Sequence, residues 1–246
     1  MRWLVRGVVR LAGAFVLASV ALVALLRFVD PPFTSLMGIR AAEAALAGRH
    51  VVVRRRWVGL DAVSPALIRS VIASEDARFF THWGIDVEAA RQAAAYNARH
   101  RGRRLRGAST ITMQCARSVF LWPARSWPRK VMETYFALLL ETLWGKRRIL
   151  EVYLNVAEWG DGVYGVEAAA ELYFGVPAAR LDARTAALLA AALPSPRRSN
   201  PSAPSAGLAA RAAAIEARAV GVRLEPLAER AALAREPERL LRSRAP

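Results

Sequence analysis

The feature that most constrains this chain is an apolar stretch near its N-terminus, residues 8–29. Only Arg10, Ser19 and Arg27 interrupt it, and its centre carries no charge. In a helix, a span of this length covers about 33 Å, which suits a bilayer whose hydrocarbon core is about 30 Å thick. The stretch therefore predicts a single transmembrane anchor, preceded by a short cytoplasmic tail of residues 1–7.

A cleaved signal peptide is the alternative for this stretch. Its apolar region normally holds about 7 to 15 residues and ends at a small-residue cleavage site, whereas here the apolar run continues through Leu25 and Leu26. Arg2 and Arg6 precede the span, which favours a cytoplasmic N-terminus and an exported remainder. The arginines at 54–56, on the other side, weaken that signal. We expect an uncleaved single-pass anchor with its N-terminus inside.

The composition indicates anionic partners. The chain has 36 Lys and Arg against 20 Asp and Glu, a formal net charge of +16. Such a charge favours a phospholipid surface or a phosphate-bearing substrate, although a genomic bias towards arginine would give the same composition. Nucleic-acid binding would rest on this charge alone and does not fit an exported chain. The single cysteine, Cys115, excludes an internal disulfide, and no two histidines have the spacing of a helical zinc pair.

Beyond the anchor, the sequence predicts one mainly α domain with a segment on either side. Residues 30–63 predict a juxtamembrane connector that includes a short helix at 39–47 and a brief strand at 51–53. Residues 64–201 carry successive helical patterns and few strand candidates. Residues 202–246 predict a C-terminal helix and a loose tail.

A pair of acids, Glu75 and Asp76, follows the first helical pattern of that domain. Val71 and Ile72 lie on the apolar face of this helix, and Glu75 continues the face at the i+4 and i+3 positions. Burial there is expected to raise the pKa of the Glu75 carboxyl, which suits a general base working near neutrality. An acid pair at a helix end is also common in ordinary turns, so the downstream motifs decide between the two interpretations.

Two downstream segments add groups that bind anions. Residues 107–121 open with small and hydroxyl-bearing residues, which can offer hydroxyl, amide and backbone N–H groups to phosphate or sugar oxygens. A helix cap is the simpler explanation, and Ser109 is not in a nucleophile elbow because Ile111 stands where glycine is needed. Farther on, Arg129 and Glu133 stand four apart on a predicted helix. Their simplest interpretation is a surface ion pair worth about 0.5 kcal/mol or less.

Taken in order, these segments resemble the family 51 peptidoglycan glycosyltransferases, and among them the short monofunctional type. The first family motif, E-D-x-x-F-x-x-H-x-G-x-D, is represented by Glu75, Asp76, Phe79, His82, Gly84 and Asp86, and the second, G-G-S-T-x-x-Q-Q-x-x-K-N, by Gly107, Ser109, Thr110 and Gln114. The third, R-K-x-x-E, is represented by Arg129, Lys130 and Glu133. The fourth, R-I-L-E-x-Y-L-N, is represented by Arg148, Ile149, Leu150, Glu151, Tyr153, Leu154 and Asn155. The resemblance covers roughly residues 57–201.

The second motif departs from the family pattern. Ala108 stands for its second glycine, Met113 for its first glutamine, and Arg117 and Ser118 for its lysine and asparagine. Arg117 keeps the positive charge, whereas the loss of an amide at Met113 removes one contact to sugar or pyrophosphate.

The resemblance implies a lysozyme-like helical domain at 64–201 that polymerises glycan chains from lipid II, the lipid-linked disaccharide-peptide precursor. The reaction would invert an α-linked donor to a β-1,4 link and release polyprenyl pyrophosphate at the outer face of the inner membrane. The implied catalytic residues are Glu75, as general base, and Glu133. The implied substrate-binding residues are Asp76, Ser109, Thr110, Gln114, Arg117, Arg129, Lys130, Arg148, Glu151 and Asn155.

The resemblance also bears on cofactors and partners. A divalent cation, Mg²⁺ or Mn²⁺, is a candidate at the pyrophosphate, and the expected partners are lipid II, the growing strand, the membrane and proteins of cell-wall synthesis or division. His82 is expected to support its turn and not to act in catalysis.

Two alternative functions stay open at this point. One is a glycan hydrolase of the lysozyme type, which would need a carboxylic acid that stays protonated. The other is a non-catalytic membrane scaffold in cell-wall assembly. A penicillin-binding transpeptidase is excluded, because S-x-x-K would need serine where Trp127 or Leu143 stands, and a P-loop is excluded because Arg147 follows Lys146.

Overall fold

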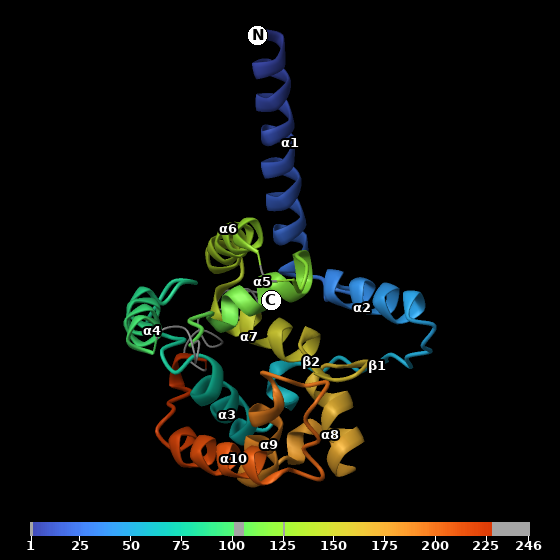
Figure 1. Cartoon of the computed structure of the whole chain (residues 1–246), viewed down its shortest axis with the longest axis vertical. Coiled ribbons are helices and arrows are strands. Elements are labelled where there is room, and N and C mark those ends of the chain that lie inside the picture. The colour runs from blue at the N-terminus through green and yellow to red at the C-terminus, as the bar shows by residue number, and fades with distance from the viewer. Residues whose placement is uncertain (1, 101–105, 125, 228–246) are drawn as a thin grey trace, which may run out of the picture.

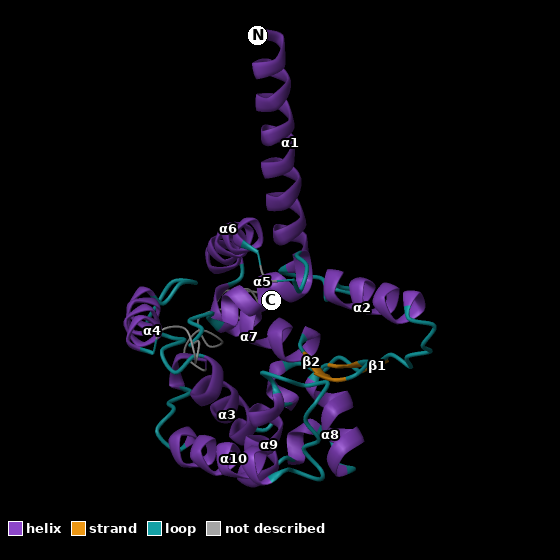
Figure 2. Ribbon diagram, in the orientation of Figure 1, coloured by secondary structure: helices purple, strands orange, loops and turns teal. Residues whose placement is uncertain are grey.

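The computed structural model describes residues 2–100, 106–124 and 126–227, and it is mainly α, as the sequence predicts. Residues 101–105, within the predicted domain, and 228–246, the end of the predicted C-terminal tail, lie outside the described residues. Figures 1 and 2 show a helical body from which one long helix projects. The helices are α1 (Arg2–Leu26), α2 (Ser35–Leu46), α3 (Pro65–Glu75), α4 (Val87–Arg99), α5 (Ile111–Phe120), α6 (Trp127–Leu143), α7 (Gly145–Val156), α8 (Val166–Phe174), α9 (Ala183–Ala192) and α10 (Ala206–Ala219), with 3-10 turns at Leu60–Ala62 and Ala178–Arg180.

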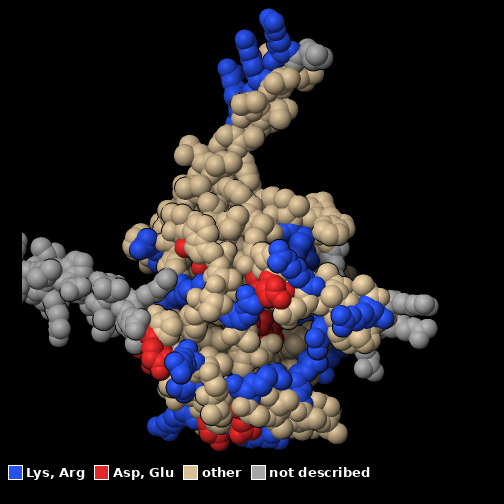
Figure 3. All heavy atoms as spheres, turned by 90° about the vertical axis from the view of Figure 1, so that its left-hand side faces the viewer, with Lys and Arg blue, Asp and Glu red and all other residues tan. Residues whose placement is uncertain are grey.

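The projecting helix is α1, the predicted anchor. Among the described residues it is the one helix long and apolar enough to cross a membrane, which is compatible with a single-pass anchor. It begins six residues before the predicted span and ends three residues before its limit. Figure 3 shows basic side chains near the free end of α1 and an uncharged band below them. The visible face of the body carries many basic and some acidic side chains.

The lower part of α1 rests on the body. The hydroxyl groups of Ser19 and Tyr135 lie 2.6 Å apart, and the ring centroids of Phe15 and Tyr135 are separated by 5.8 Å, so α1 packs along α6. The indole N–H of Trp144, just before α7, donates to the Val23 carbonyl at 2.6 Å. α1 is therefore joined to α6 and to the start of α7, the helices that carry the third and fourth motifs.

The connector contains a helix, as predicted, but its strand is displaced. Val51 to Val53 were expected to form the strand, whereas β1 is Arg54–Arg55. β1 pairs in parallel with β3 (Val163–Tyr164), which also pairs antiparallel with β2 (Glu158–Gly160). The register follows from the hairpin partner, because the N–H of Arg54 donates to the Gly162 carbonyl at 2.8 Å. Periodicity within the connector carries no information about that distant carbonyl.

Side-chain caps fix where the site helices begin. Ser64 accepts from the N–H of Ala66 and is followed by Pro65 in the first turn of α3. Asp86 caps α4, Thr110 caps α5 and Ser126 caps α6 in the same way. The ends of the elements that carry the predicted motifs are thus determined locally.

The core forms where these helices meet. In the lower layer α3 packs against α9 and α10, and α9 presents alanines, such as Ala187 and Ala190, that are fully buried and allow close approach. Above it, α5 packs against α6 and α7, whose Ile149 and Leu150 are fully buried. The end of α3 is joined to α5 by hydrogen bonds, and Tyr153 of α7 bonds to Gln114 of α5, so this junction positions the candidate site.

Candidate active site

Glu75 is the last residue of α3, and its carboxylate meets α5. The side-chain amide of Gln114 donates to Glu75 Oε2 at 2.9 Å, and the Tyr153 hydroxyl of α7 donates to Gln114 Oε1 at 3.2 Å. Burial raises the pKa of the Glu75 carboxyl and outweighs the opposing effects of the Gln114 hydrogen bond and the Arg117 charge. The predicted direction of this pKa shift is confirmed, and a carboxyl so placed can accept a proton near neutrality.

Asp76, the neighbouring acid, is held by contacts within the chain. Its carboxylate accepts from the N–H of Ile111 at 3.0 Å and contacts His82 Nε2 at 2.9 Å. The Thr110 hydroxyl donates to the Gly84 carbonyl at 2.6 Å, which ties the same turn to the start of α5. His82 is buried and supports this turn, as expected. These contacts give Asp76 and Thr110 a positioning role, while their predicted contact with substrate stays a prediction.

Glu133 lies among three cationic side chains. Arg129 forms a hydrogen bond with its carboxylate, Lys130 Nζ lies 3.3 Å from Oε2, and Arg117 lies 3.7 Å from Oε1. The plain interpretation of Arg129 and Glu133 as a surface pair is wrong, because their side chains are only 8% and 1% exposed. The face of α6 that carries them turns towards α5, together with the buried Phe136 and Ala137.

The same cluster brings the second motif to the third. Lys130 Nζ donates to the Ser109 hydroxyl at 2.9 Å and lies 3.8 Å from the sulfur of Met113, the residue that replaces a family glutamine. The side chains of Lys130 and Arg117 are 39% and 33% exposed, whereas Glu133 is buried beneath them. A net positive surface that is held from below by one carboxylate can bind a multiply charged anion such as pyrophosphate.

Arg117 connects the two carboxylates. Arg117 is a partly exposed cation of the Glu133 cluster, and its charge also lowers the pKa of Glu75. The Glu75 carboxylate and the cationic cluster around Glu133 therefore lie within electrostatic reach of one another. The structure brings seven of the predicted residues into this arrangement: Glu75, Ser109, Gln114, Arg117, Arg129, Lys130 and Glu133.

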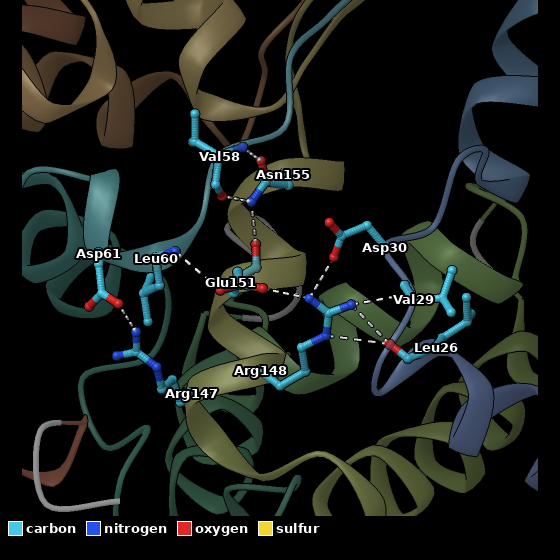
Figure 4. Close-up of polar contacts among 10 residues, drawn as sticks. All are labelled: Leu26, Val29, Asp30, Val58, Leu60, Asp61, Arg147, Arg148, Glu151 and Asn155. Atoms are coloured by element: carbon cyan, nitrogen blue, oxygen red, sulfur yellow. Dashed lines mark hydrogen bonds and ion pairs between the residues drawn. The ribbon is translucent and has the colours of Figure 1, made fainter. Parts of the chain in front are cut away.

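The three predicted residues of the fourth motif make other contacts, shown in Figure 4. Arg148 binds the carbonyls at the end of α1, Glu151 accepts from the N–H of Leu60 at 3.1 Å, and Asn155 bonds to both backbone groups of Val58 at 2.8 and 2.9 Å. These are contacts with the anchor and the connector. They give Arg148, Glu151 and Asn155 a structural role, and their implied role in binding substrate stays a prediction.

Sequence reasoning missed two polar groups in the core. Tyr153 belongs to the fourth motif but is not among the predicted site residues, yet its hydroxyl orients Gln114. Glu141 has no predicted role, yet it is buried and accepts from Lys146 and from Thr112, each at 2.7 Å. A hydroxyl inside an apolar stripe and an acid five residues before a lysine were the only signals for these contacts.

A divalent cation finds no protein-built site here. Among the residues that the structure describes, no three His, Cys, Asp or Glu side chains gather to share a metal ion. At Glu133, the cationic neighbours occupy the positions where further carboxylates would be needed. We therefore assign no chemical step to a protein-held metal.

The chain is similar to known proteins along most of its length. A family profile described as Transglycosylase matches residues 43–220. The chain is 52% identical over 225 residues to a biosynthetic peptidoglycan transglycosylase of Rhodospirillum centenum, covering 92% of this chain and 94% of that protein. Proteins of the same description from Pseudomonas entomophila and Bdellovibrio bacteriovorus are 50% and 46% identical, each covering 80% of this chain and, respectively, 83% and 76% of the relative.

Proposed function

The chain belongs to the transglycosylase family of peptidoglycan glycosyltransferases, and from this we propose that its substrate is lipid II, which it polymerises with inversion and release of polyprenyl pyrophosphate. The observation that carries the proposal is the pairing of Glu75 with the cationic cluster over Glu133 through Arg117. A raised carboxyl pKa serves proton removal, and a net positive surface serves a pyrophosphate leaving group.

In the proposed reaction, Glu75 acts as the general base. It removes the proton of the acceptor sugar's 4-hydroxyl, and the oxygen attacks the anomeric carbon of the lipid-bound growing chain. The bond between that carbon and the pyrophosphate oxygen breaks, and its electron pair leaves with the pyrophosphate. Gln114, which donates to Glu75 Oε2 at 2.9 Å, keeps the other oxygen available for the proton.

The cluster over Glu133 would stabilise the departing pyrophosphate. Lys130 and Arg117 are exposed enough to reach phosphate oxygens, while Arg129 is buried against Glu133. The carboxylate holds the cationic side chains in place and prevents them from separating by mutual repulsion. We assign Glu133 this positioning role, with Ser109 orienting Lys130 at 2.9 Å. A divalent cation, if it takes part, would arrive bound to the pyrophosphate.

The proposed location is the inner membrane, with the domain on its outer face. α1 is compatible with a single-pass anchor, and the arginines at its start favour a cytoplasmic N-terminus. An anchored domain stays within reach of a substrate whose tail lies in the bilayer, and its basic surface suits an anionic lipid headgroup.

A polymerisation assay tests the proposal. The full-length protein in lipid vesicles is incubated with labelled lipid II, with and without a chelator, and the products are separated by size. Long glycan strands that carry a terminal pyrophosphate lipid are expected. A parallel incubation uses finished peptidoglycan in place of lipid II. Soluble fragments released from it would indicate a hydrolase instead, and no product from either lipid II or peptidoglycan would indicate a scaffold.

A further inference from the structure

We propose that Arg148 is a positioning residue that locks the membrane helix to α7 and so sets the height of Glu75 above the bilayer. This inference rests on the proposed function only for its activity readout. Its structural basis is the cluster of contacts at the end of α1 that Figure 4 shows.

Arg148 satisfies backbone groups that the end of α1 leaves free. Its Nη2 donates to the carbonyls of Leu26 at 3.0 Å and Val29 at 3.1 Å, and its Nη1 pairs with Asp30 at 2.8 Å. The last carbonyls of a helix have no partner within it and carry the negative end of the helix dipole, so a guanidinium is well matched to them. With only 14% of its side chain exposed, Arg148 is held by these contacts and by Glu151 of α7, which its Nη1 also reaches at 2.5 Å.

A second side chain strengthens the same joint. The N–H of Arg27 bonds to the Ala24 carbonyl, which leaves the Val23 carbonyl to the indole of Trp144 at 2.6 Å. Trp144 immediately precedes α7 and is buried. Two donors from one end of α7 therefore hold the last two turns of the anchor.

α7 carries this constraint to the proposed base. Arg148 and Tyr153 are five residues apart, about 7.5 Å along a helix. From Tyr153 two hydrogen bonds, of 3.2 and 2.9 Å, lead through Gln114 to Glu75. The covalent route from α1 to α3 is the much longer connector of residues 30–63, which is itself folded, because α2 packs against α5 and β1 pairs with β3. Arg148 adds a short path from α1 to Glu75 that runs through α7, beside the packing of α1 along α6.

The test compares substrates that do and do not require a fixed height. Full-length Arg148→Ala in vesicles is expected to polymerise long-tailed lipid II about tenfold more slowly, because misplacement of the reacting groups by about 1 Å is costly. On a short-tailed, water-soluble analogue its rate should stay within about twofold of the wild type, because that substrate meets the site free of the membrane. Arg148→Lys should restore part of the rate.

A matched control and a direct measurement accompany this test. Arg147→Ala removes the adjacent arginine, which pairs with Asp61 at 2.6 Å on the surface, and should leave both rates unchanged. Spin labels at Leu17→Cys, exposed on α1, and Val220→Cys, exposed on the body, report the distance between the two parts, while the native Cys115 is fully buried and stays unlabelled. The distance distribution should broaden in Arg148→Ala.

Three results would overturn the inference. Equal losses of rate on both substrates would show that Arg148 acts in substrate binding or in folding. Unchanged rates would show that Arg148 does not position the site. An unchanged distance distribution would show that Arg148 does not hold α1 against α7. If Arg148→Ala does not fold, Asp30→Asn takes its place, because it weakens the same joint from the side of α1. If the wild type makes no polymer, the proposed function fails, and the spin-label distances alone decide on the joint.

Discussion

Glu75, the last residue of α3, and Glu133, in the interior of α6, are the two carboxylates of the candidate site, yet their surroundings differ. Glu75 has an amide as its hydrogen-bond partner, and burial raises its pKa. Glu133 is 1% exposed and is surrounded by Arg117, Arg129 and Lys130. The same side chain is thereby prepared to take a proton in one place and to hold positive charge in the other.

The comparison shows that neighbours decide which acid can act as a base. The oxygens of Glu133 face Arg117, Arg129 and Lys130, so that carboxylate serves to hold these cations in place. A carboxylate with one neutral donor loses little when it is protonated. Four substitutions test this division of roles, from the largest expected effect to the smallest.

Glu75→Gln should have the largest effect on activity. We expect polymerisation to fall by about 10³-fold, because the amide cannot accept the proton of the acceptor hydroxyl. The free energy of unfolding at neutral pH should be unchanged or higher, since a carboxyl whose pKa is raised in the folded state costs stability once it ionises. Strand synthesis and chemical denaturation measure the two quantities. Glu88→Gln, at a partly exposed acid on α4 that accepts from Gln92, is the control, and activity that survives in Glu75→Gln would contradict the role of Glu75 as the base.

Glu133→Gln should differ by affecting stability as well. Removing one member of a buried ion pair leaves Arg129 uncompensated, which is expected to cost about 3 kcal/mol or more. Polymerisation should fall by about 10²-fold, because the cationic side chains lose their position against the pyrophosphate. Denaturation and initial rates measure these effects, with Glu171→Gln, at an exposed pair with Arg56, as the control. A variant as stable as the wild type would contradict the buried pairing.

Arg117→Ala should change the pKa of Glu75 and remove one cation from the cluster around Glu133. Its charge lowers the pKa of Glu75, so its removal should raise that pKa further. The activity is expected to rise with pH as Glu75 ionises, over a range above the ordinary value of 4.5, and in Arg117→Ala this rise should move to higher pH. The maximal rate should also fall by about tenfold, because one contact to pyrophosphate is lost. A pH–rate profile tests this, with Arg184→Ala as the control. An unshifted profile would show that the charge of Arg117 does not act on Glu75.

Tyr153→Phe should have the smallest effect. The variant loses the hydroxyl that orients Gln114 at 3.2 Å, while the aromatic ring keeps its place in the core. One neutral hydrogen bond is worth about 1 kcal/mol, so a fall in rate of about fivefold or less is expected. Tyr173→Phe, which removes a hydroxyl elsewhere in the domain, is the comparison. A loss as large as that of Glu75→Gln would give Tyr153 a direct role in catalysis.

The sequence by itself determined the local features of this protein. The long apolar helix α1 follows from one apolar run, and the starts of α3 and α4 follow from Ser64 with Pro65 and from Asp86, because a helix end depends on the few residues around it. The raised pKa of Glu75 could also be predicted, since the apolar face that buries it is written into residues three and four positions away.

Only the tertiary structure decided what surrounds each charge. Arg129 and Glu133 have the spacing of a surface pair, and they are buried because α5 covers that face of α6. Arg148 stands in a motif that the resemblance assigns to substrate, yet it contacts Leu26 and Asp30 more than a hundred residues earlier. Spacing along one helix fixes which side chains share a face, whereas desolvation and ion pairing depend on the element that packs against that face.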